Sequence, residues 1–148
     1  MNRLKSNLRF WCLVLSGCAS LAGCGDGRPQ RVKVSGRVLI DGQPLTHGFV
    51  QVIPKGNRAA TGEIGADGRF SLTTFTPGDG CVPGRHPAAV IATESINATS
   101  QRWHAPKKYA DVTRSGLEVN VEKATDNLEI QLSWNGGRPF VESFEAEQ

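Results

Sequence analysis

The chain has little of what builds helical or membrane-spanning proteins. Its apolar run at Phe10–Leu15 is too short for a lasting transmembrane helix, which needs about 20 residues. Glycine and proline, 17 and 8 of 148 residues, are too frequent for a helical bundle or a coiled coil. Hydrophobic residues still make up 39% of the chain, which argues against wholesale disorder. Length and composition therefore indicate one folded domain of ordinary size.

A net charge of one sign is also missing once the N-terminal segment is set aside. The chain carries 17 basic and 14 acidic side chains, and three of the basic ones, Arg3, Lys5 and Arg9, precede the apolar run. The rest of the chain carries 14 basic and 14 acidic side chains, so its net charge is zero. Because nucleic-acid binding depends on a positive field that neutralises phosphates, we expect no nucleic-acid partner.

The N-terminus has the order of a secretory signal: a basic start, a short apolar stretch and then small residues. The junction Leu21-Ala22-Gly23-Cys24 resembles a bacterial lipobox. That resemblance implies cleavage before Cys24, a diacylglycerol on its thiol and an acyl chain such as palmitate on the new amine. Leu15-Ser16-Gly17-Cys18 also fits the pattern, but the polar stretch that follows Cys24 favours the later site as the start of a tether. An ordinary secretory signal is the alternative.

This interpretation divides the chain into a signal peptide (1–23), a tether (24–31), a folded domain (32–134) and a flexible acidic tail (135–148). The protein is then expected on a membrane surface of the cell envelope, held by lipid. Cys12 and Cys18 leave with the signal and Cys24 carries lipid, so Cys81 has no partner for an intrachain disulfide.

Alternating apolar residues separated by turn formers predict short strands throughout the domain. Seven strands are expected, around residues 32–40, 50–52, 61–64, 70–74, 87–93, 117–121 and 128–134. Their number and spacing are typical of an antiparallel β-sandwich. The segment 94–116 interrupts the rhythm, and its length indicates a functional loop or a short helix.

Two stretches of this pattern resemble transthyretin-like and carboxypeptidase regulatory-like domains. The first is Val34-Ser35-Gly36-Arg37-Val38 with the turn Asp41-Gly42-Gln43-Pro44, and the second is Thr61-Gly62 through Asp67-Gly68-Arg69-Phe70. Later residues, including Pro106-Lys107-Lys108-Tyr109, are similar to small bacterial envelope lipoproteins with such a domain. The resemblance implies an all-β, seven-stranded Greek-key sandwich that is usually a non-catalytic module.

Catalytic signatures are lacking. The hydroxyisourate hydrolases of the transthyretin-like fold end in Tyr-Arg-Gly-Ser, whereas this chain ends in Phe144-Glu145-Ala146-Glu147-Gln148. No serine lies in a G-x-S-x-G frame. We therefore expect a protein that is not an enzyme and has no cofactor.

Two alternatives concern ligand binding. A copper site of the cupredoxin kind would use His47, Cys81 and His86, although the axial methionine of such sites is missing. A glycan site would use the cationic and aromatic residues of the long segment, namely Arg102, Trp103, His104, Lys107, Lys108 and Tyr109. Exposed and coplanar rings at Trp103 and Tyr109 would favour glycan binding, and burial of both would favour a plain scaffold.

Overall fold

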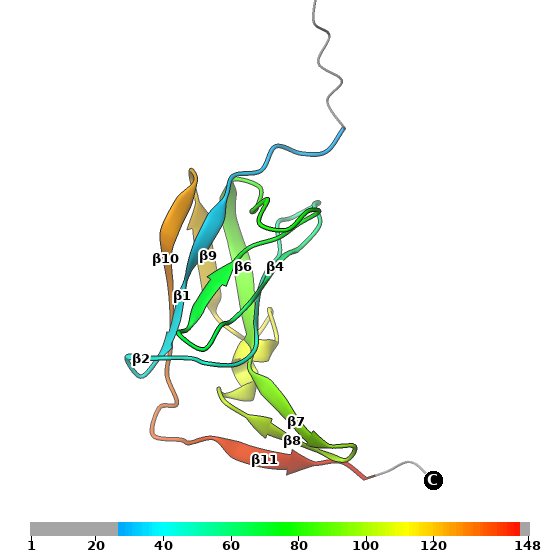
Figure 1. Ribbon diagram of the computed structural model, residues 1–148, viewed down its shortest axis with the longest axis vertical. Coiled ribbons are helices and arrows are strands. Elements are labelled where there is room, and N and C mark those ends of the chain that lie inside the picture. Colours follow the sequence, from blue (N-terminus) through cyan, green and yellow to red (C-terminus); the bar gives the residue numbers. More distant parts are fainter. Residues whose placement is uncertain (1–26, 146–148) are drawn as a thin grey trace, which may run out of the picture.

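The computed structural model describes residues 27–145, and these form an all-β fold with one short 3-10 helix (Figure 1). The strands are β1 (Val34–Ile40), β2 (Gln43–Pro44), β3 (Phe49–Val52), β4 (Ala60–Glu63), β5 (Arg69–Ser71), β6 (Gly84–Ile91), β7 (Thr93–Asn97), β8 (Ser100–Trp103), β9 (Leu117–Val121), β10 (Thr125–Leu132) and β11 (Phe140–Ser143), with the helix η1 at Lys107–Ala110. The predicted all-β class is confirmed. Each of the seven expected strands overlaps one of these, and β2, β7, β8 and β11 are additional.

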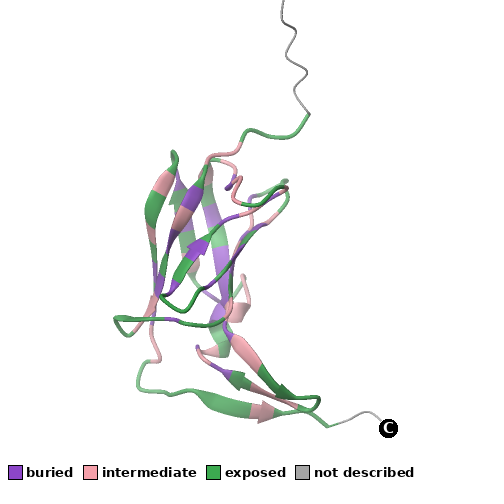
Figure 2. Cartoon of the chain, in the orientation of Figure 1, coloured by how far each residue is buried: buried purple, intermediate pink, exposed green. Residues whose placement is uncertain are grey.

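Two larger sheets enclose the core. In one, β1 lies between β10 on one side and β2 and β5 on the other; the second has the order β4-β3-β6-β9. Alternate residues point inward in strands of both sheets, such as β1 and β9, so that buried positions alternate with more exposed ones there (Figure 2), whereas Ala88–Val90 of β6 are buried on both faces. Val38, Val50 and Val90 are essentially inaccessible, and each such burial stabilises the fold by about 1.5–3 kcal/mol. The arrangement is consistent with a β-sandwich.

The expectation of purely antiparallel pairing is wrong for one pair. β1 runs parallel to β10, with Val38 opposite Ile130. Alternation of apolar residues reports which face of a strand is buried but not the direction of its neighbour, so the sequence pattern could not predict this. The close approach requires glycine at position 36, where an added Cβ would lie 1.8 Å from the carbonyl oxygen of Leu128.

The segment 94–116, expected to be a functional loop or to hold a short helix, does hold a short helix, η1, and it also contains most of a β-hairpin formed by β7 and β8, which was not expected. Residues 140–143, in the segment expected to be a flexible tail, form β11 and pair with β8, with Phe140 opposite Trp103. The three strands make a small sheet of order β11-β8-β7. It lies at the end of the long axis opposite to residues 27–33 (Figure 1).

Candidate functional site

The small β7–β8–β11 sheet and the adjoining η1 position all six residues of the expected 102–109 site. Successive residues of β8 point to opposite faces of the sheet. Arg102 and His104 therefore lie on one face with Glu94, the residue paired with Arg102, while Trp103 lies on the other. The structure brings the six residues to one end of the molecule but divides them among three clusters.

The first cluster is centred on the carboxylate of Glu142 in β11. Its Oε2 accepts hydrogen bonds from Trp103 Nε1 (2.8 Å) and Gln101 Nε2 (3.3 Å), and its Oε1 pairs with the ammonium of Lys107. These hydrogen bonds, first that of Lys107 and then that of Trp103, hold the pKa of Glu142 below its usual range. The Trp103 ring also stacks on Phe140 with a centroid distance of 6.3 Å. Together these contacts fasten β11 to β8 and η1.

The second cluster surrounds Tyr109, the buried residue of η1. Its hydroxyl oxygen accepts a hydrogen bond from the backbone N–H of Ser133 (3.1 Å), just beyond β10. The ammonium of Lys108 lies 4.7 Å from the centroid of the Tyr109 ring, within cation–π range. Tyr109 is 7% exposed and Trp103 is 9% exposed. With both rings covered, neither face is open for a sugar to stack on, and the geometry matches the scaffold alternative.

The third cluster was not foreseen. The rings of His104 and His47 stack with centroids 4.7 Å apart, and His104 Nε2 lies 3.0 Å from Glu94 Oε2. Arg102 is 3.8 Å from the same oxygen, and both of these side chains are nearly half exposed, so that ion pair contributes little. The pKa of Glu94 is lowered, first by the hydrogen bond with His104. His104 and His47 were candidate residues of two different sites, and no local signal in the sequence indicates that they lie together beside Glu94 of β7.

The residues of the copper alternative are not assembled. Phe49 pairs with Ile91 and Val52 with Ala88, so His47 and His86 lie near opposite ends of β6, roughly 20 Å apart at about 3.3 Å per residue. Cys81 is fully buried, and burial raises the pKa of its thiol, which disfavours the thiolate that binds metal. His86 Nε2 is engaged by the carbonyl oxygen of Val82 at 2.9 Å. Residues 27–145 contain no group of three or more His, Cys, Asp or Glu side chains placed to hold a metal ion.

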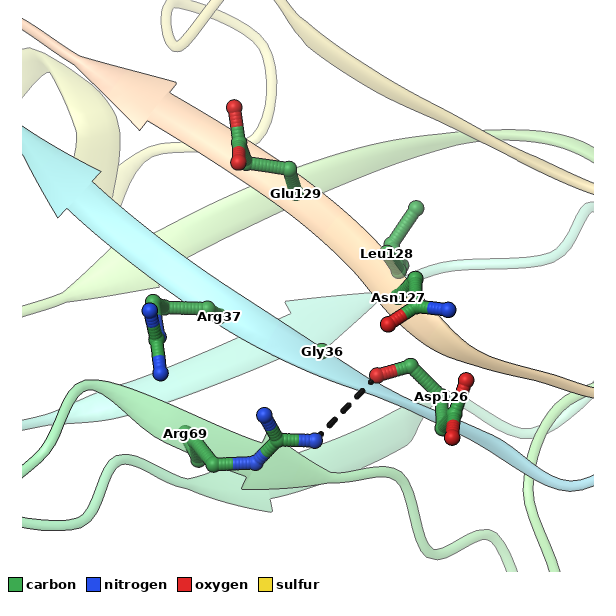
Figure 3. A pocket seen from close by; sticks show the side chains of 7 residues that line it. All are labelled: Gly36, Arg37, Arg69, Asp126, Asn127, Leu128 and Glu129. Atoms are coloured by element: carbon green, nitrogen blue, oxygen red, sulfur yellow. Dashed lines mark hydrogen bonds between the residues drawn. The ribbon is translucent and has the colours of Figure 1, made fainter.

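A small hollow of about 170 Å³ lies on the outer face of β1, β5 and β10 (Figure 3). Arg37 and Arg69 face each other across the β1–β5 pair, and Arg69 Nη2 donates to the carbonyl oxygen of Asp126 (3.3 Å). Asp126 and Glu129 line the same hollow. Because both signs of charge are represented, the hollow shows no clear preference for an ion.

Comparisons with protein-family models, with curated proteins and with solved structures find no match for this chain. Cys24 and Cys18, the candidate lipidation sites, lie outside the described residues. Within residues 27–145, no helix has the length and apolar character needed to cross a bilayer.

Proposed function

We propose that this protein is a non-catalytic lipoprotein of the cell envelope, anchored through acylated Cys24, whose β-domain presents a binding or structural surface. We further propose that this domain is a transthyretin-like, carboxypeptidase regulatory-like sandwich with Greek-key connections. The observation that supports this function best is the placement of the two ends. Residues 27–33, which lead into β1, lie at one end of the long axis, and the β7–β8–β11 sheet lies at the other (Figure 1). An anchor at Cys24 would therefore leave this sheet facing away from the membrane.

The surface of the small sheet supports a binding role. Five large hydrophobic residues of the described chain are exposed, and four of them belong to this sheet or follow it directly: Ile96, Phe140, Val141 and Phe144. Phe140 and Val141, as successive residues of β11, project from opposite faces of the sheet, so both faces carry exposed apolar side chains of the kind found at interaction sites. The same region is also the part of the domain that extends beyond the two core sheets.

Among residues 27–145, no strand pairs with the outer edge of β11. The N–H of Phe144 donates to the carbonyl oxygen of Thr99 (2.7 Å). Since hydrogen-bonded residues alternate along an antiparallel strand, the backbone groups of Val141 and Ser143 point away from β8. An open edge beside apolar side chains favours a protein partner that adds a strand, rather than the glycan alternative.

Membrane fractionation tests the proposal. The wild-type protein is expected in the membrane fraction of its own host and to resist extraction by high salt, because acyl chains rather than charge hold it. Cys24→Ser should abolish this anchoring, whereas the matched variant Cys18→Ser should leave it intact. Membrane anchoring that survives Cys24→Ser, or wild-type protein recovered as a soluble chain, would overturn the proposal.

A further inference from the structure

Basic side chains gather where the described chain emerges, at the end opposite to the small sheet. Three guanidinium groups converge on the ring of Phe75: those of Arg28, Arg31 and Arg58, at 4.8, 4.7 and 5.5 Å from its centroid. Lys55 lies in the same β3–β4 connection as Arg58, and both are exposed. We call Arg28, Arg31, Lys55, Arg58 and Phe75 the tether-end cluster.

One carboxylate that contacts this cluster, that of Asp79, is already engaged. Asp79 Oδ2 lies 2.9 Å from Arg31 Nε, although that N–H is not aligned for a hydrogen bond. The same carboxylate accepts hydrogen bonds from the backbone N–H groups of Thr74, Phe75 and Thr76. No ion pair joins Lys55 or Arg58 to an acidic side chain within residues 27–145.

The balanced charge of the chain beyond Arg9 thus conceals an uneven distribution. The nearby β9–β10 turn holds one charge of each sign, Glu122 and Lys123, and does not offset the cluster. Asp79 offsets the charge of Arg31, whereas the exposed side chains of Lys55 and Arg58 form no ion pair among the described residues. An anionic surface would supply the counter-charges for these two side chains. Arg28 follows Cys24 by only four positions, so a lipid anchor would bring the cluster directly to the headgroups.

We infer that the tether-end cluster binds the anionic phospholipid headgroups of the membrane that holds the anchor. The inference rests on the proposed function and deepens it: the acyl chains retain the protein, and the cluster sets its orientation. Contact through this end holds the long axis upright and keeps the β7–β8–β11 sheet away from the bilayer. Each basic side chain near an anionic surface changes such an equilibrium about fivefold. Reversing two charges changes the charge by four units and should therefore lower the equilibrium constant for docking by about two to three orders of magnitude.

The tryptophans of the chain provide a readout. Trp11 precedes Cys24, which leaves Trp103 and Trp134 in the mature protein; Trp103 is in the small sheet, and Trp134 contacts Phe140 of that sheet. Acylated protein is reconstituted into phosphatidylcholine vesicles with and without phosphatidylglycerol, each carrying a dansyl-labelled lipid. Energy transfer from tryptophan to dansyl should be lower in the anionic vesicles, because the docked domain holds both tryptophans away from the bilayer. Added salt should remove the difference.

Two double variants with the same change in net charge, one inside the tether-end cluster and one outside it, are compared. Lys55→Glu combined with Arg58→Glu should abolish the effect of phosphatidylglycerol. Arg114→Glu combined with Arg138→Glu changes the net charge equally, outside the tether-end cluster, and should preserve the effect. Energy transfer that is insensitive to lipid charge, or equally altered in both double variants, would overturn the inference alone. Failure of the wild-type protein to float with neutral vesicles would instead refute the anchor, and this inference with it.

Discussion

His47 and His104 stack with their rings 4.7 Å apart and inclined by only 12°. His47 precedes β3 and His104 follows β8, so the contact joins a core sheet to the small sheet. His104 also carries the hydrogen bond to Glu94. The stacked pair therefore connects the part of the fold that holds the core to the part that extends from it.

The hydrogen bond between His104 and Glu94 should keep the pKa of Glu94 low. Replacing His104 with Phe keeps an aromatic ring against His47 but removes the bond, so the pKa of Glu94 should rise toward its ordinary value. His47→Phe should raise it less. Because the folded-state pKa of Glu94 is lowered, the stabilisation is present above the ordinary pKa and is lost as the pH falls through the lowered one. Carboxyl NMR titration measures the shift, and an unchanged pKa in His104→Phe would contradict this interpretation.

Glu142 should control the attachment of β11. Glu142→Ala removes the acceptor of Trp103 and the partner of Lys107, so amide protection should fall in β11 while that of β6 is retained. Acidification should act in the same direction, because the pKa of Glu142 is lowered in the folded state and its contacts weaken as the pH falls through that value. Hydrogen exchange measures both effects. Glu145→Ala is the control, and equal loss of protection in β6 would show that the effect is not confined to β11.

Much of the core could be predicted from sequence, and the small sheet could not. Residues such as Val50, Val52 and Ile130 are apolar on one face of a strand, and that alternation predicts both a strand and its buried side. The residues of β7 are intermediate or exposed, so no such contrast marks it. The pairing of His104 with Glu94 and His47 depends on strand register and on a contact between sheets, neither of which spacing along the chain reveals.

Gly36 should be among the glycines least tolerant of substitution. In Gly36→Ala the new methyl group would lie 1.8 Å from the Leu128 carbonyl oxygen, so β1 and β10 must separate locally, at a cost of at least about 2 kcal/mol. Gly42→Ala is the matched comparison: its φ is +80° but nothing lies within 4 Å, so only backbone strain of about 1–2 kcal/mol is expected. Urea unfolding followed by tryptophan fluorescence measures both. Equal costs would show that the β1–β10 pair relaxes freely.

Asp79 should stabilise the loop between β5 and β6. Burial raises the pKa of Asp79, but the hydrogen bonds from Thr74, Thr76 and Phe75 outweigh it and the net pKa is lowered. Asp79→Ala leaves these N–H groups unpaired and should reduce the free energy of unfolding by about 1.5–3 kcal/mol. Asp67→Ala, which removes one side-chain hydrogen bond to Arg69 N, should cost less. Urea denaturation at neutral pH compares the two, and a larger loss for Asp67→Ala would contradict the assignment.

The lipid anchor is the central claim, and intact mass spectrometry tests it most directly. Protein extracted from the membranes of its own host should have the mass of a chain that begins at Cys24 and carries diacylglycerol and an amide-linked acyl chain. The Cys24→Ser variant should lack these additions and retain its signal segment. An unmodified wild-type chain, or one acylated at Cys18, would contradict the assignment of Cys24.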